Sequence, residues 1–332
     1  MSDGVSTASS VRDADGAVDR GLNWLLLTGN RLLVAIGLTV VAILVVYGLI
    51  QADVITVGPD SVAETAFGSG LISGTLTLVT VALSINQLIL SRVFGSPDGL
   101  RDKLDGTREL RTRVRDHAGE SATPNDPAEF LSLIAETLSD HADRFETTAG
   151  GSVDGEPSVR SYAEGIRSYG ESIDEKIENG TNIVDVLVVI IGTEYARNLT
   201  ATEYIGQELE ESLSEEASEE LEAIDDLLES IAITRQFFKT LSLQQDFARL
   251  SRVVAYTGFV ALLTSIVLTL LYRPEGMMID PAYAPLVVSV GLGIILTPLT
   301  IFIAYILRAA TIGRRTVSVG PFVPPEDREE DS

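Results

Sequence analysis

Four long apolar segments dominate this sequence and restrict the folds that it can adopt. The clearest one runs from Leu71 to Leu90, contains no charged residue and is followed directly by Ser91 and Arg92. A helix of this length can cross the hydrocarbon core of a bilayer. Similar segments occupy about 32–50, 253–271 and 285–307. The pattern predicts an all-α, polytopic protein of the cell membrane with four transmembrane helices, for which the lipid bilayer is the first partner.

The basic residues are distributed asymmetrically around these segments. Of the 24 lysines and arginines, only Arg273 lies in a stretch expected to face the exterior. Because loops rich in lysine and arginine remain in the cytoplasm, we expect both termini and the central segment there. The expected organisation is a disordered cytoplasmic tail (1–20), a first transmembrane pair (21–95), a helical cytoplasmic domain with a long stalk (96–252), a second transmembrane pair (253–308) and a disordered acidic tail (309–332).

The chain is strongly acidic, with 48 aspartates and glutamates and a net charge of −24. This composition resembles that of proteins from haloarchaea, which accumulate molar salt. At about 1 M salt the Debye length is roughly 3 Å, so an acidic face says little about a cationic partner. Without a basic surface, nucleic-acid binding is not expected. The absence of cysteine excludes disulfides, thiolate metal sites and cysteine nucleophiles.

The central segment has the periodicity of helices. Asp126 followed by Pro127 and Glu129 predicts a capped helix start, and an amphipathic helix follows it. A second helix is expected at 157–178. The run IVDVLVVII at 183–191 is too short to span a bilayer; it predicts a buried core helix, with a short strand or a re-entrant segment as alternatives. From 207 to 257 there is neither glycine nor proline, which favours a helical stalk that continues into the third span.

Small polar side chains recur along the second apolar segment at spacings of four and three residues, which places them on one face of a helix. In a bilayer, such a face either packs closely against another helix or lines a hydrated pore around an oligomer axis. The sequence leaves both interpretations open. The residues of this polar stripe are Ser73, Thr77, Thr80, Ser84 and Gln87.

Two further features of the spans bear on function. None of them contains Asp, Glu, Lys, Arg or His, and such residues are usually retained in membranes for ion or proton coupling, so a coupled transporter is disfavoured. Pro298 interrupts the fourth span and is a candidate hinge, with a static kink as the alternative.

No other pattern indicates chemistry. The acidic run at 203–229 lacks the arrangement of a calcium-binding loop and is explained by solvation at high salt, with a divalent-cation sensor as the alternative. His117 and His141 have no metal-binding partner at helical spacing, and His141 is expected in a core. There is no phosphate-binding loop, dinucleotide glycine pattern or hydrolase motif. We therefore expect no enzyme activity, no cofactor and no metal site.

The stretch Ser84, Ile85, Asn86 and Gln87, followed by Leu90, Ser91, Arg92 and later Arg101, resembles an uncharacterised group of prokaryotic membrane proteins that is common in haloarchaea. The resemblance covers the second span and its cytoplasmic exit. It implies four spans and supplies no function.

These observations lead to two hypotheses of function. The first is an oligomeric channel-like protein, a homo-oligomer in which the second span faces a pore and the cytoplasmic domain regulates it. The second is a membrane-anchored scaffold or signalling module whose acidic helices bind a cytoplasmic protein partner.

Overall fold

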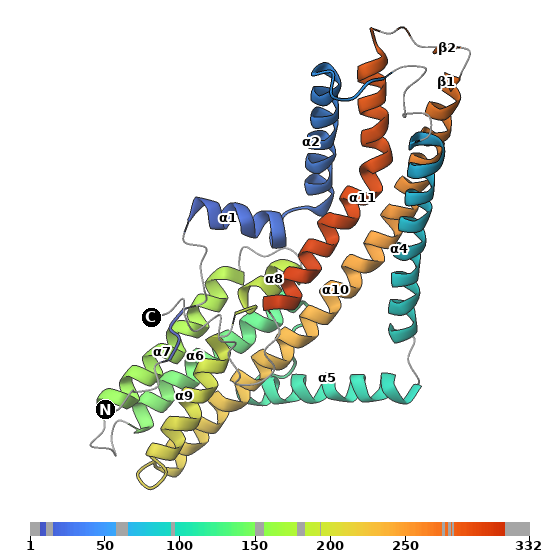
Figure 1. Cartoon of the computed structure of the whole chain (residues 1–332). Helices are drawn as coiled ribbons and strands as arrows, with labels where there is room; N and C mark the ends of the chain where they lie inside the picture. The colour runs from blue at the N-terminus through green and yellow to red at the C-terminus, as the bar shows by residue number, and fades with distance from the viewer. Residues whose placement is uncertain are drawn as a thin grey trace. The chain divides into compact units, whose positions relative to one another are not determined.

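The computed structural model describes residues 7–10, 16–57, 66–93, 97–149, 156–177, 183–192, 194–273, 276–277, 280 and 282–315. Regular structure in these residues is helical, except for two strands of two residues each. The predicted all-α class is confirmed (Figure 1). Most of the expected acidic tail lies outside the described residues. Backbone contacts divide the chain into unit 1 (1–21, 96–242 and 311–332) and unit 2 (22–95 and 243–310).

Unit 2 contains the apolar segments. Four helices are long and apolar enough to cross a membrane, judged by length and composition. The segment expected at 71–90 forms α4, which η2 precedes. The long helix α10 contributes residues to both units. The helices are α2 (Arg31–Gln51), α4 (Ile72–Val93), the last part of α10 (Glu215–Leu271) and most of α11 (Ala284–Arg315), accompanied by η1 (Trp24–Thr28) and η2 (Ala66–Leu71). Most of α1 (Ala17–Asn23) belongs to unit 1.

Within unit 2, α11 lies between α2 and α10, and α4 flanks α10 (Figure 1). Glycines permit the close approaches. A Cβ atom added at Gly293 of α11 would lie 2.3 Å from Ile43 Cγ1 of α2, and one at Gly258 of α10 would lie 2.4 Å from Val79 Cγ2 of α4. Strands β1 (Tyr272–Arg273) and β2 (Gly276–Met277) pair antiparallel between α10 and α11.

Two apolar clusters form the core of unit 2. One includes Ala35 of α2, Ala82 of α4, Val254 of α10 and Ala304 of α11, so all four helices contribute to it. The other gathers residues near the opposite ends of the helices, including Ile50 of α2 and Leu268 of α10, and Phe67 of η2 is buried in it.

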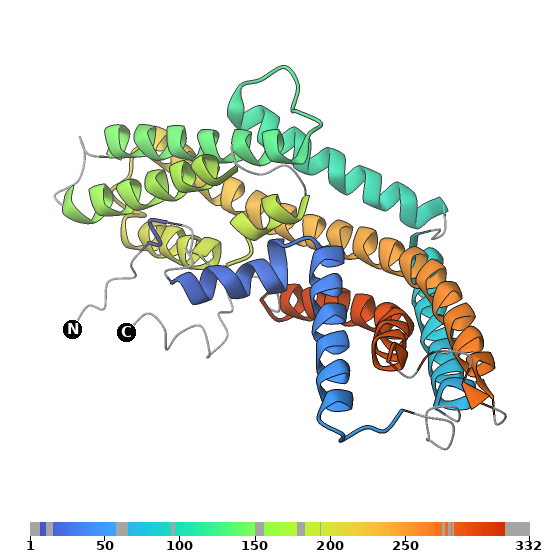
Figure 2. The ribbon, with the colours of Figure 1, turned by 90° about the horizontal axis from the view of Figure 1, so that it is seen from above.

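Unit 1 is a bundle of helices in which α6 and α7 run side by side (Figures 1 and 2). Gly170 of α7 allows this approach, because a Cβ atom there would lie 2.6 Å from the carbonyl oxygen of Ala135 in α6. The buried rings of Phe145 and Tyr162 meet edge to face at 5.6 Å. The helices are α5 (Pro97–Ala118), α6 (Pro127–Ala149), α7 (Glu156–Ile177), α8 (Ile183–Val189), α9 (Glu194–Glu208) and the first part of α10.

Several sequence predictions for unit 1 are confirmed. The Asp126 carboxylate accepts hydrogen bonds from the amides of Ala128 and Glu129 at 2.8 and 3.2 Å, which is the predicted cap. The run after residue 182 forms the short helix α8, whose Leu187 is fully buried, as the core-helix interpretation expects.

Two boundaries differ from the expectations. A turn at 209–214 separates α9 from α10, although no glycine or proline interrupts the sequence there. The stalk therefore starts at Glu215 and then runs unbroken for 57 residues, about 85 Å. In the stretch expected to be a disordered tail, Ala8 is buried and exchanges two backbone hydrogen bonds with the amide side chain of Asn198, at 2.8 and 3.2 Å.

Candidate functional site

Most of the polar stripe of α4 lies on the side that faces away from the other described helices of unit 2, and Thr77 borders a groove against α11. The opposite side of α4 packs into the bundle through Thr75 and Ala82, which are buried, and through Leu78 and Val79. Because residues three and four apart share one side of a helix, the stripe forms a single face of α4, which the described residues leave largely exposed. All five stripe residues, Ser73, Thr77, Thr80, Ser84 and Gln87, are exposed.

Hydroxyl groups of the stripe bond to their own helix. The hydroxyls of Thr77, Thr80 and Ser84 each donate a 2.9 Å hydrogen bond to the carbonyl oxygen four residues earlier. This geometry satisfies the donor at little cost in an apolar medium. It leaves the oxygen lone pairs directed outward, where they can accept a hydrogen bond from water or coordinate a cation.

Pro298 lies inside α11, which bends along its length (Figure 1). A proline has no amide hydrogen, so the carbonyl of Ile294 loses its helical donor. Neighbouring threonines stabilise the region: Thr297 Oγ1 donates to the Gly293 carbonyl at 2.9 Å, and Thr300 Oγ1 donates to the Thr297 carbonyl at 2.9 Å. Thr300 also bonds Thr39 of α2 through the two hydroxyls, 2.8 Å apart.

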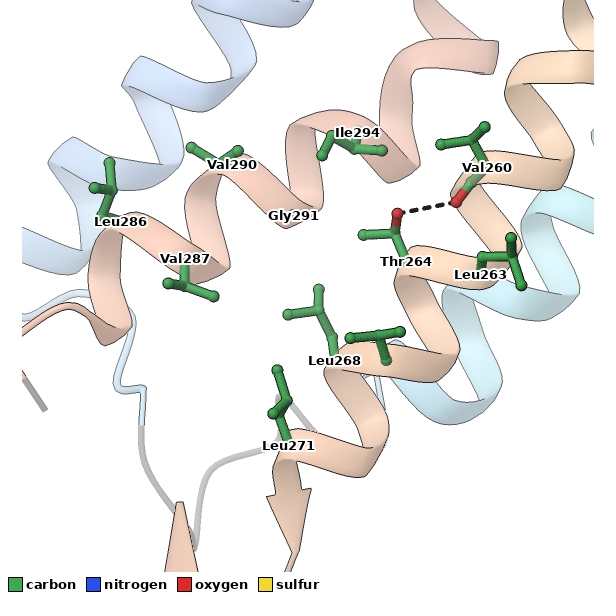
Figure 3. Close-up of a pocket in the computed structure, with 11 residues that line it drawn as sticks. Val260, Leu263, Thr264, Leu268, Leu271, Leu286, Val287, Val290, Gly291 and Ile294 are labelled. Atoms are coloured by element: carbon green, nitrogen blue, oxygen red, sulfur yellow. Dashed lines mark hydrogen bonds between the residues drawn. The ribbon is translucent and has the colours of Figure 1, made fainter. Parts of the chain in front are cut away.

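Two apolar grooves run along α11. The first, about 520 Å³, lies between α10 and α11; in Figure 3, Leu268 of α10 points toward α11, on which Gly291 lies between Val290 and Ile294. The second, about 450 Å³, lies between α4 and α11 and is lined by both Thr77 and Pro298. The second groove therefore brings together one residue of the stripe and the candidate hinge.

A buried ionic cluster in unit 2 was not predicted. Arg31, Asp246 and Arg308 are 3%, 8% and 8% exposed. Arg308 Nη1 lies 3.2 Å from both carboxylate oxygens of Asp246, and its Nη2 donates to the carbonyl of Gly29 at 2.7 Å. Arg31 Nε donates to the same carbonyl at 2.8 Å. Two guanidinium groups and one carboxylate thus hold the start of α2 against α10 and α11.

The sequence carried a weak signal for this cluster. Arg31 and Arg308 directly border two predicted spans, and Asp246 lies shortly before a third. Their positions in the sequence predict only that they lie at the cytoplasmic ends of the spans. Their pairing leaves no local sequence pattern, because the three residues are far apart in the chain.

A second unpredicted network joins three helices of unit 1. His141 of α6 is buried, and its Nδ1 lies 2.5 Å from Glu220 Oε2 of α10. His117 Nε2 of α5 lies 3.0 Å from Asp226 Oδ2, and the two imidazole rings meet edge to face at 5.7 Å. The core position expected for His141 is confirmed. Among the described residues, no group of three or more His, Asp or Glu side chains is arranged to hold a metal ion.

The acidic run therefore has two parts. Glu220 pairs with His141 and Asp226 pairs with His117, and Arg113 pairs with Glu229 at 3.0 Å. The pKa of Asp225 is raised, mainly by partial burial and to a smaller extent by the nearby charges of Glu229 and Asp226. The remaining exposed carboxylates are Glu203, Glu208, Glu210, Glu211, Glu215, Glu216, Glu219 and Glu222.

Arg235 is a buried cation of unit 1. Its Nη2 donates at 2.9 Å to the carbonyls of Ile191, just after α8, and of Arg315, at the end of α11. Its guanidinium also lies 5.1 Å from the Tyr195 ring centre. Burial lowers the pKa of Arg235. Helix carboxyl ends carry partial negative charge, so one guanidinium stabilises two of them at once.

The fold and these features define an all-α protein with four helices able to cross a membrane, a hydroxyl-lined exposed face on one of them, and a helical second unit. The chain belongs to a family described as "Family of unknown function (DUF7972)", whose model matches residues 2–332. No curated protein and no solved structure matches it.

Proposed function

We propose that this protein is an oligomeric channel-like membrane protein in which α4 of each chain faces a central pore. The observation that carries the proposal is the exposure of all five stripe residues on the side of α4 opposite its packed face. A hydroxyl-lined face that the described helices leave exposed suits a water-filled pathway. Leu76 and Val81 flank the stripe and are also exposed, as contacts between neighbouring copies of α4 would require. Since each chain offers one such helix, several chains must surround the pore.

In the proposed topology, α2, α4, the last part of α10 and α11 cross the bilayer, with both termini and unit 1 in the cytoplasm. The asymmetry of the basic residues supports this orientation. A single cysteine introduced at Val54, after α2, should react with a membrane-impermeant thiol reagent added outside intact cells. A single cysteine at Glu171 in α7 should react only after the membrane is opened. Reaction at Glu171 but not at Val54 in intact cells would contradict the proposed topology, and the proposed pore would have to be abandoned as well.

The pore is tested in the same cysteine-free background. Single cysteines at Ser73, Thr77, Thr80 and Ser84 are expected to react with aqueous thiol reagents in the assembled protein. A cysteine at Leu44 of α2 is the matched control, because that side chain is 62% exposed yet lies on an apolar helix expected to face lipid. The control should remain unreactive. If none of the four stripe cysteines reacts with the reagents, a hydrated pore is excluded.

A membrane-anchored scaffold is the second candidate, and the eight exposed carboxylates of α9, of α10 and of the turn between them favour it. In that case the helices of unit 2 would only dimerise, and the carboxylates would bind a basic surface of a cytoplasmic protein. Chemical cross-linking in native membranes distinguishes the two candidates. A ring of identical chains supports the channel, whereas a dimer carrying one soluble protein per chain supports the scaffold.

A further inference from the structure

The described residues of unit 1 leave the first half of α5 exposed. Leu100 and Leu104 are 49% and 50% exposed, whereas Leu110 and Val114, further along the same helix, are buried. In Figure 1 the Pro97 end of α5 extends beyond the other helices of unit 1. Two exposed leucines spaced by four residues form a small apolar face on this half of the helix.

The charged residues of this half of the helix are sorted by side. Asp98, Asp102, Asp105 and Glu109 follow one another at spacings of four, three and four residues, which places them together on the face opposite the leucines. The basic residues flank the apolar face, with Arg101 and Arg108 along one border and Lys103 along the other.

This arrangement is the one that an interfacial helix needs. Leucines enter the boundary between headgroups and acyl chains, basic side chains beside them reach lipid phosphates, and acidic residues face water. A helix surrounded by water would gain nothing from the leucines. The ion pairs that Asp105 makes with Arg101 and Arg108, at 3.8 and 3.9 Å, are between exposed side chains and do not hold the basic groups in place.

We propose that Pro97–Glu109 lies on the cytoplasmic surface of the bilayer and binds anionic lipid headgroups. The inference rests on α4 crossing the membrane and is independent of whether a pore exists. Only three residues separate Val93, the end of α4, from Pro97. Four peptide steps span at most about 15 Å, so the chain itself keeps the start of α5 near the membrane surface.

The experiment uses the full-length protein with single cysteines carrying an environment-sensitive fluorophore. The positions are Leu100 and Leu104 on the apolar face, with Asp102 and Glu109 as matched controls on the opposite face. The protein is reconstituted into vesicles of phosphatidylglycerol and phosphatidylcholine whose acyl chains carry bromine as a quencher. Quenching and a blue shift are expected at positions 100 and 104, and neither at 102 and 109. Quenching should weaken in vesicles of phosphatidylcholine alone.

Three outcomes would overturn the inference. Equal quenching on both faces would mean that the helix does not lie at the interface. A blue shift at 100 and 104 without quenching by the brominated lipid would identify a protein, either a second copy or another partner, as what covers the leucines. Quenching that is unchanged without anionic lipid would remove the role given to Arg101, Lys103 and Arg108.

Discussion

Replacing Asp246 with alanine is expected to destabilise the protein by about 3–5 kcal/mol. The carboxylate is the acidic partner of Arg308 at 3.2 Å, and Arg31 lies in the same cluster. All three side chains are buried. Removing the carboxylate would leave two guanidinium groups buried with backbone carbonyls as their partners, and an uncompensated buried charge is costly. Thermal unfolding of the purified protein in detergent, at fixed salt, measures the loss.

The control for this prediction is Asp105→Ala. Asp105 pairs with Arg101 at 3.8 Å, but the side chains are 57% and 81% exposed, so the change should cost less than about 1 kcal/mol. Asp246→Asn keeps the size of the side chain but removes its charge. It should lose most of the stability that Asp246→Ala loses. If Asp246→Asn unfolds like the unmodified protein, the charge of this residue does not stabilise the fold.

Replacing Gly293 with alanine has the second largest expected effect, a destabilisation of about 1–3 kcal/mol. The added methyl group would meet Cγ1 and Cδ1 of Ile43, so the Ile43 side chain would have to change rotamer or α11 and α2 would have to separate. Gly37→Ala in α2 is the matched control, because a Cβ atom there meets nothing within 4 Å. That change should be neutral or stabilising by up to about 1 kcal/mol, since alanine is the better helix former.

The double variant Gly293→Ala with Ile43→Ala checks the cause. Because Ile43→Ala removes the atoms that the new methyl group would meet, the double variant should lose less stability than the sum of the two single variants. Strict additivity would show that Gly293 is not required for the contact between α2 and α11. The measurement is again the unfolding temperature in one detergent.

The sequence was sufficient where the physical rule is local. Asp126 caps its helix as predicted, since the Asp-Pro-x-Glu pattern depends on four neighbouring residues. The second apolar segment forms a helix within a few residues of its expected bounds, because length and the absence of charge determine it. The start of α10 was missed: the turn at 209–214 contains no glycine or proline, and the signal that marks the new helix is Ser214, whose Oγ accepts a hydrogen bond from the amide of Ala217 at 3.2 Å.

The candidate site was predictable in part for the same reason. Spacing alone placed Ser73 and Thr77 on one face of α4. It could not say whether that face packs against the rest of the chain, because a polar face has no required direction in a membrane. Arg31, Asp246 and Arg308 are separated by long stretches of sequence, and so are His117 and Asp226. Their pairing depends on the arrangement of whole helices, which no short-range pattern records.

Unit 1 is assembled from widely separated stretches of the polypeptide. Asn198 holds the backbone of Ala8, and Arg235 holds the carbonyl of Arg315 at the end of α11. A ribosome releases residue 315 only after all four apolar helices have been made. Unit 1 therefore cannot finish folding while its central helices are being synthesised. Its folding is complete only after the last apolar helix has been made.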